Sequence, residues 1–245
     1  MPVDGPSSYG DVFARVYDDW YHDVSDVDGT VATVAKLAAG RPILELGVGT
    51  GRIAVPLARA GERVTGLDSS QAMLRGCQAK EGADTIQIVR ADMAHIPFTR
   101  GFGLVLVTFN TFFNLTTPSD QESCVQGIAA SLQSDGSLLV EAFVPNDEPD
   151  AVEYVETSRS DRDGGRVVTT ATREPQAQTV RGVHIHTPAS GPTARLPWTI
   201  RYLHPRQLDE LCANSGLELA ERWSDWGGSH FDSDSTHHIS HYRVV

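Results

Sequence analysis

Three glycines follow a short apolar run in the sequence LELGVGTGR, at residues 44–52. A strand that ends in glycines brings backbone amides and a helix N-terminus to the carboxyl edge of a parallel sheet, where such sheets bind ligands. Gly47, Gly49 and Gly51 are spaced GxGxG, whereas a dinucleotide site uses GxGxxG to approach a pyrophosphate. Glu45 precedes the first glycine by two residues, and its carboxylate would repel a phosphate and attract an ammonium group. The turn therefore predicts a cofactor that is cationic at this end.

Two further acidic residues follow at the ends of the next expected strands. Asp68 stands in GLDSS, seventeen residues after Gly51, and Asp92 and Met93 stand in RADM. ELGVGTG followed by GLDSS resembles motif I and its successor in class I S-adenosylmethionine (SAM) dependent methyltransferases, and the resemblance covers most of the chain. It implies that Asp68 accepts both ribose hydroxyls, that Asp92 binds the adenine amino group and that Met93 packs against the ring.

The resemblance places a SAM site over three consecutive strand ends. Its expected cofactor-binding residues are Tyr17, Glu45, Gly47, Gly49, Gly51, Arg52, Asp68, Ser69, Met73, Asp92, Met93 and Phe109. Each acidic residue also has a purely structural interpretation, Asp68 beside a helix N-cap and Asp92 in a turn.

The stretch TFNTFFNL, residues 108–115, is the expected wall facing the methyl group. Methyl transfer from a sulfonium is an in-line displacement, so the enzyme mainly aligns the nucleophile and excludes water. Asn110 is placed to hydrogen-bond near the methionine moiety, and Phe109, Phe112 and Phe113 to wall the site unless they belong to the core. The stretch lacks the Asn/Asp-Pro-Pro-aromatic pattern of enzymes that methylate adenine or glutamine amides. A small substrate with a reactive amine or hydroxyl is therefore favoured.

The N-terminal stretch YGDVFARVYDDWY carries aromatic residues at helical spacing: Phe13, Tyr17, Trp20 and Tyr21, with Tyr9 before them. Such a stripe is typical of a packing face. In the family the N-terminal helix commonly folds over the cofactor, and an aromatic face beside a sulfonium gains about 0.5–2 kcal/mol of cation–π attraction. We therefore expect Tyr9 and Tyr17 to act as lid residues. The predicted catalytic set is Tyr9, Tyr17, Asn110 and Phe113.

No metal site is expected. HHISH, at residues 237–241, places His237 and His241 on one strand face and His238 on the other, a poor geometry for three convergent ligands. His184, His186 and His204 are freer to face a substrate as general bases, with a structural role as the alternative. Cys77, Cys124 and Cys212 are widely spaced and odd in number, so neither a disulfide framework nor a zinc knuckle is indicated.

Alternating strands and helices must position these residues. The patterns predict strands over 42–46, 63–68, 85–92, 102–110 and 134–144, and helices over 52–61, 69–80 and 119–132. Runs typical of an added antiparallel sheet follow at 167–173, 179–186 and 198–203, and then a helix over 204–216 and two closing strands, with a surface loop over 226–236. The fold class is α/β: a Rossmann-like, mostly parallel seven-stranded sheet with helices on both faces and a small antiparallel β addition.

The chain is expected to form one methyltransferase domain over residues 1–245. Within it we predict a helical lid (1–40), a SAM-binding core (41–145), the added sheet (146–203) and the closing helix and strands (204–245). The formal net charge of −12 and the scattered arginines argue against nucleic acid as a partner. No apolar run long enough for a membrane span and no signal-peptide pattern are visible, which indicates a cytoplasmic protein with no membrane partner. Homo-oligomerisation is left open.

The expected function is methyl transfer from SAM to an amine nitrogen of a small molecule. YDDWY and the added sheet before RYLHPRQLDEL are similar to glycine and antibiotic-sugar N-methyltransferases. The arginine-rich, lysine-poor composition suggests a GC-rich genome, which is compatible with an antibiotic pathway, for instance one for an aminosugar or a lincosamide. The alternatives are a small-molecule O-methyltransferase, an NAD-dependent oxidoreductase and a non-catalytic SAM-binding protein.

Overall fold

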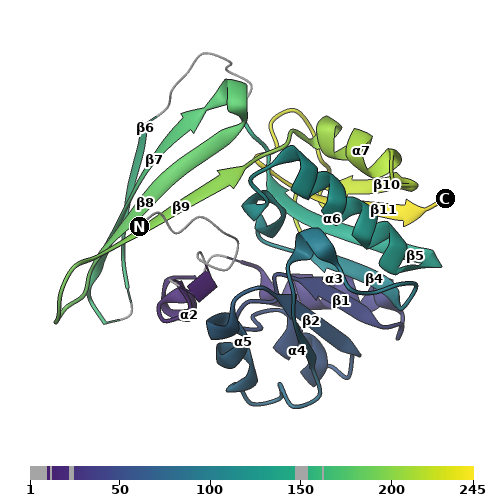
Figure 1. The fold of residues 1–245 in the computed structure, drawn as a ribbon, viewed down its shortest axis with the longest axis horizontal. Coiled ribbons are helices and arrows are strands. Elements are labelled where there is room, and N and C mark those ends of the chain that lie inside the picture. The colour runs from purple at the N-terminus through teal and green to yellow at the C-terminus, as the bar shows by residue number, and fades with distance from the viewer. Residues whose placement is uncertain (1–9, 12, 22–24, 147–153, 162) are drawn as a thin grey trace.

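The computed structural model describes residues 10–11, 13–21, 25–146, 154–161 and 163–245. A seven-stranded sheet in the order β10-β11-β5-β4-β1-β2-β3 forms its centre (Figure 1). Its strands are β1 (Ile43–Leu46), β2 (Val64–Asp68), β3 (Gln87–Arg90), β4 (Phe102–Val107), β5 (Leu132–Phe143), β10 (Leu217–Trp223) and β11 (His237–Val244). The first five strands pair in parallel, and β11 and β10 run antiparallel to their neighbours. The predicted fold class is confirmed.

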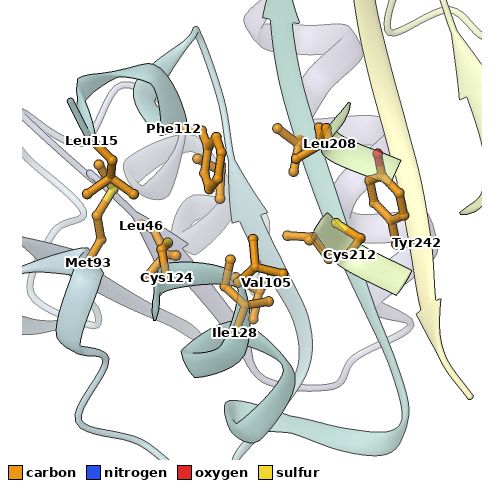
Figure 2. Close-up of a cluster of buried hydrophobic side chains, with 14 of the residues drawn as sticks. Leu46, Met93, Val105, Phe112, Leu115, Cys124, Ile128, Leu208, Cys212 and Tyr242 are labelled. Carbon is orange, nitrogen blue, oxygen red and sulfur yellow. The ribbon is translucent and has the colours of Figure 1, made fainter. Parts of the chain in front are cut away.

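Helices cover both faces of this sheet, because the central strands are apolar on both sides. Every residue of β1 and β4 is buried. On one face, Leu104 and Leu106 of β4 pack with α3 (Val27–Ala38), α4 (Ala54–Arg59) and α5 (Gln71–Gln78). On the other face, Val105 and Val107 pack with α6 (Pro118–Ser131) and α7 (Pro205–Ala213). Figure 2 shows part of this second cluster, with Val105 of β4 near Cys124 and Ile128 of α6.

Local signals in the sequence fix where these helices begin. Asp26 caps α3 by accepting a hydrogen bond from the amide of Gly29, and Ser70 caps α5 in the same way from Met73. Pro118 and Pro205 each occupy a first-turn position of α6 and α7. The short 3₁₀ helices η1 (Met93–His95) and η2 (Thr111–Asn114) follow β3 and β4. Helix α3 lies within the segment that was expected to form the lid, and it covers the sheet.

A second, four-stranded antiparallel sheet has the order β6-β7-β8-β9. It consists of β6 (Tyr154–Ser160), β7 (Arg166–Glu174), β8 (Thr179–Thr187) and β9 (Ala194–Arg201), with η3 (Pro175–Ala177) between β7 and β8. The sequence patterns predicted three of these strands and missed β6, whose polar composition hides its period. Figure 1 shows this sheet at one end of the molecule, near α2 (Tyr17–Trp20).

The expected surface loop over residues 226–236 needs one correction. Trp226 is buried, and its indole Nε1 donates a hydrogen bond to Oε1 of Glu141 in β5. Its backbone oxygen accepts a hydrogen bond from the hydroxyl of Thr33 in α3. The loop therefore begins inside the core, because the large apolar ring finds a polar partner there. None of the helices in the described ranges combines the length and hydropathy that a membrane span requires.

Candidate functional site

A cavity of about 340 Å³ opens where the carboxyl ends of the central strands meet the second sheet. Ten of the residues predicted to bind the cofactor or to act in catalysis line it: Tyr17, Gly47, Gly49, Asp68, Ser69, Met73, Asp92, Met93, Phe109 and Asn110. Glu45, Gly51, Arg52 and Phe113 do not line it, and Tyr9 lies outside the described residues. The topology of a parallel sheet explains the gathering, since successive strands end at the same edge.

Glycine occupies each of three positions in the turn after β1 for a separate physical reason. Gly47, Gly49 and Gly51 have φ angles of +67°, +56° and +78°, a region that favours glycine. A Cβ atom on Gly47 would clash with Thr111, and one on Gly51 would clash with Cys77 and Val55. A Cβ on Gly49 would meet only the backbone oxygen of Gly47, at 3.9 Å. The surface at Gly49 is therefore open to a ligand that comes close to the backbone.

The Asp68 carboxylate holds two backbone segments at the end of β2. Its Oδ2 accepts a hydrogen bond from the amide of Gly49 at 2.9 Å, and its Oδ1 accepts one from Ser70 at 2.8 Å. Burial raises the pKa of this carboxyl, and the two amides oppose the rise. Each oxygen retains a lone pair for a further donor, so the group can position the turn and bind hydroxyls at once.

Asp92 stands at the end of the neighbouring strand, β3. Its Oδ1 accepts a hydrogen bond from the amide of Ala94 at 2.9 Å and so begins η1. Met93 and Met73 are nearly buried and present apolar surface to the same cavity. This end of the cavity thus combines two carboxylates with flexible thioether side chains, a surface that can accept both hydroxyls and a flat ring.

Glu45 lies beneath the turn, away from the cavity surface. Burial raises the pKa of its carboxyl to about 8, although the nearby guanidinium of Arg52 opposes the rise. One carboxylate oxygen has no hydrogen-bond partner among the described residues. The expected contact between Glu45 and an ammonium group therefore stays a prediction, and a ligand would have to reach it past the glycines.

Arg52 joins the turn to the N-terminal segment and to the end of β4. Its guanidinium lies 4.2 Å from the ring centre of Phe109 and within 3.4 Å of the Tyr17 hydroxyl and the Tyr21 carbonyl oxygen. The cation therefore packs behind the aromatic rings that line the cavity.

The backbone at the end of β4 takes an unusual course. Phe109 and Asn110 have φ angles of +52° and +61°, so two successive residues other than glycine are left-handed. Glu141 of β5 holds both, through hydrogen bonds from the Phe109 amide to Oε2 and from the Asn110 amide to the backbone oxygen. The side-chain oxygen Oδ1 of Asn110 accepts a hydrogen bond from the backbone amide of Phe143 at 2.7 Å. Asn110 consequently offers its NH₂ group, a donor, to the cavity.

The phenylalanines after this turn divide between core and cavity. Phe113, expected in the catalytic set, is buried and packs edge-on against Phe143 at 5.1 Å. Phe112 is buried beside it, and Phe143 lines the cavity. The short helix η2 turns both expected wall residues inward, so the wall comes from Phe109 and Phe143.

The aromatic side chains of the N-terminal segment divide between two surfaces, the second sheet and the cavity. Phe13 and Trp20 are buried, and the Trp20 ring meets His184 and His186 of β8. Tyr17 and Tyr21 line the cavity, with ring centres 4.9 Å apart. Burial raises the pKa of the Tyr17 phenol to about 12, so this hydroxyl stays protonated at neutral pH.

Two aspartates fasten the N-terminal segment to the core. Asp11 accepts a hydrogen bond from the hydroxyl of Ser70 at 2.6 Å. Asp18 accepts one from Thr50, in the glycine turn, and forms an ion pair with Lys80 at 2.8 Å. The segment that carries Tyr17 and Tyr21 is therefore tied to the glycine turn and to α5.

The second sheet supplies the remaining wall through His184, Trp198 and Ile200. His186 instead bonds Asp161 at 2.7 Å, and His204 lies at the start of α7. No group of three His, Cys, Asp or Glu side chains in the described part of the chain is placed to hold a metal ion. The three cysteines are free and buried.

Comparison with known proteins decides the family. Residues 43–136 match the methyltransferase domain family. The CcbJ methyltransferase from Streptomyces caelestis superimposes with a TM-score of 0.90 and 33% sequence identity over 99% of this chain and 100% of that one. The chain belongs to the SAM-dependent methyltransferases.

Two other proteins are less similar. A cypemycin N-terminal methyltransferase from Streptomyces sp is 30% identical over 142 residues, 57% of this chain and 58% of that protein. SAM-bound CalS10 from Micromonospora echinaspora, an amino pentose methyltransferase, shares the fold, with a TM-score of 0.71, 18% identity and coverage of 94% of this chain and 97% of that one. The matched regions span little more than half the length of the curated relatives.

The cofactor of this methyltransferase is SAM, and the site fits it. The open surface at Gly49 admits a close ligand, and Asp68 and Asp92 offer acceptors for hydroxyl and amino groups. Behind the turn lies an oxygen of Glu45 that has no hydrogen-bond partner within the described part of the chain. The assignment of single cofactor contacts to these residues remains a prediction.

Sequence reasoning missed several wall residues: Gly10, Tyr21, Leu67, Thr111, Asn114, Phe143, Trp198 and Ile200. Thr111 and Asn114 lay within the stretch already singled out. Trp198 and Ile200 are two residues apart in β9, so the sequence already indicated that they share one face of the strand. The sequence did not indicate what that face contacts, because the contact depends on how the two sheets pack.

Proposed function

We propose that this methyltransferase moves the methyl group of SAM to an amine nitrogen of a small molecule, in the biosynthesis of an antibiotic or another secondary metabolite. Bound SAM supplies an electrophilic methyl group. In the transfer, the amine lone pair forms the new N–C bond, the C–S bond breaks with its electron pair on sulfur, and the resulting methylammonium later loses a proton to water.

One observation carries the choice of nitrogen over oxygen. A hydroxyl acceptor needs a base to remove its proton, whereas an amine in its free-base form is already nucleophilic. Among the described lining residues after β4 and in the N-terminal segment and second sheet, the polar side chains are the phenols of Tyr17 and Tyr21, the side-chain amides of Asn110 and Asn114, the Thr111 hydroxyl and one imidazole, His184. The Tyr17 phenol stays protonated, and Asn110 offers its NH₂ group. Burial lowers the pKa of His184 to about 4, which makes it a weak base. These groups suit an acceptor that needs no deprotonation by the protein.

The side chains that line the cavity support a small molecule as the acceptor. Aromatic and apolar side chains, Tyr21, Phe109, Phe143, Trp198 and Ile200, line the cavity together with the glycine turn. They exclude water from a displacement that water would compete with. The name of the cypemycin relative, an N-terminal methyltransferase, agrees with an amine acceptor.

The test is a screen with SAM labelled in its methyl group. Purified protein is incubated with primary and secondary amines and with matched alcohols in which a hydroxyl replaces the amino group. We expect labelled N-methyl products and S-adenosylhomocysteine in equal amounts. Turnover of alcohols alone would replace nitrogen by oxygen, and SAM binding without turnover of any compound would contradict the proposal.

A further inference from the structure

His184 occupies a defined position between the second sheet and the cavity. It lies in β8 directly opposite Thr169 of β7, and its side chain is only 8% exposed. Its Nδ1 atom and the Thr169 hydroxyl are 2.7 Å apart. One ring nitrogen is thereby used, which leaves Nε2 for a ligand in the cavity that His184 lines.

Aromatic rings fix the plane of this imidazole. Trp198 of β9 stacks on it, with ring centres 5.6 Å apart and an angle of 30° between the planes. Phe13 and Trp20 meet it edge-on at 5.3 and 5.6 Å. A side chain held on three sides and hydrogen-bonded on the fourth presents its remaining nitrogen in one direction.

The charges around His184 disfavour both a protonated imidazole and a protonated amine beside it. Arg159 of β6, stacked over Tyr21, lowers the pKa of His184 further, after the larger effect of burial. The neighbouring carboxylate, Asp161, is bound to His186. Asp68 and Asp92 belong to the ends of β2 and β3, where backbone amides hold them. No carboxylate among the described lining residues therefore comes from the second sheet to receive an ammonium group.

We propose that neutral His184, held by Thr169, accepts through Nε2 a hydrogen bond from the N–H of an unprotonated acceptor amine. The inference rests on the proposed amine methylation and defines the substrate class further: primary or secondary amines that bind as the free base. An acceptor for the N–H leaves the nitrogen lone pair free for the methyl group, whereas a donor would occupy that lone pair. Nδ1–H donates to Thr169 in the productive tautomer, so Thr169 is a positioning residue.

The test compares two ligands on matched variants. The ligands are the amine that the screen above turns over fastest and its fully N-methylated product, which has no N–H in its free-base form; both are measured above their pKa values. We expect wild-type protein to bind the N–H amine more tightly than the fully methylated one in the presence of S-adenosylhomocysteine, and His184→Phe to lose this difference. The same variant should keep its SAM dissociation constant within about twofold and lose about tenfold in kcat/KM, as one lost hydrogen bond implies.

Thr169 tests the tautomer without removing the ring. Thr169→Val should lower kcat/KM in the same direction as His184→Phe, and Thr169→Ser should restore it. His186→Gln, on the same face of β8 but outside the cavity lining, is the control and should leave the ligand difference unchanged.

The wild-type kcat/KM should rise with pH up to the pKa of the amine, because only the free base binds. His184→Phe and Thr169→Val variants that keep the wild-type kcat/KM and ligand difference would overturn the role of His184 alone. If the wild-type protein methylates no amine, the proposed function fails and this inference with it.

Discussion

Oε2 of Glu141 accepts a hydrogen bond from the backbone amide of Phe109 at 2.8 Å, across the boundary between β5 and the end of β4. Its other carboxylate oxygen accepts one from the indole of Trp226. One carboxylate thus holds a left-handed backbone segment that lines the cavity and anchors the loop beside α3. The site depends on a residue that does not line it.

Glu141→Ala should disturb the acceptor wall more than the cofactor site. It leaves the Phe109 amide and the Trp226 indole without their acceptor, at a cost of about 1–3 kcal/mol for each donor that stays buried. We expect a lower free energy of unfolding in urea and a larger fall in kcat/KM for the amine than in SAM affinity. Glu141→Gln, which keeps one carbonyl acceptor, should lie between. Equal losses of SAM affinity and acceptor turnover would contradict this division.

Asp68→Asn should weaken SAM binding while the fold survives. The amide keeps one acceptor for the backbone, but its NH₂ group faces a donor and cannot accept a ribose hydroxyl. Loss of a charge-assisted hydrogen bond removes about 1.5–3 kcal/mol, so affinity measured by calorimetry should fall at least about tenfold. A folded variant with wild-type affinity would refute the ribose assignment.

Gly49→Val should abolish SAM binding with only a modest loss of stability. The φ angle of +56° strains any side chain by about 1–2 kcal/mol, but a Cβ atom meets nothing closer than 3.9 Å. Gly61 is a matched control, since its φ is +89° and the space beside it is empty. Gly61→Val should therefore suffer the strain and keep SAM binding. Retained binding by Gly49→Val would remove the turn from the site.

Glu45→Gln should alter how stability depends on pH in the absence of SAM. Burial raises the pKa of this carboxyl from 4.5 to about 8, so between these pH values the folded protein holds a proton that the unfolded chain has released. Stability must then fall as pH rises through that window. The advantage of the Gln variant, measured by urea unfolding, should grow from about pH 5 to 8 and level off above it. Glu81→Gln removes a carboxylate at an exposed position and serves as the control variant.

Local patterns in the sequence predicted most of the fold and the gathering of the expected cofactor-binding residues at one edge of the sheet. The GxGxG turn, Asp68 and Asp92 each follow an apolar strand, and the parallel sheet brings strand ends together whatever the details of packing. The acceptor half could not be predicted in this way. His184 and Trp198 reach the cavity only because a second sheet packs against the first, and η2 turns Phe113 inward although it looked like a wall residue. The sequence gives one indication of the role of Glu141, because it is an acidic residue within the apolar run SLLVEAFV.

Tyr17 offers the test of the aromatic lid. Its ring lines the cavity, and its hydroxyl is 3.4 Å from the guanidinium of Arg52. Tyr17→Phe keeps the ring and any cation–π attraction to the sulfonium, of about 0.5–2 kcal/mol, whereas Tyr17→Ala loses ring and hydroxyl. We expect a large fall in kcat and in SAM affinity for the Ala variant and a small one for Phe.

The hydroxyl has a narrower role than the ring, because a phenol with a pKa of about 12 does not accept a proton from an amine at neutral pH. Equal large falls for Tyr17→Phe and Tyr17→Ala would therefore assign the effect to the hydrogen bond with Arg52, and Arg52→Lys should then reproduce them. The same pair of substitutions at Tyr9 tests the other lid residue expected from the sequence. Wild-type rates in all four tyrosine variants would show that Tyr9 and Tyr17 do not act as a lid.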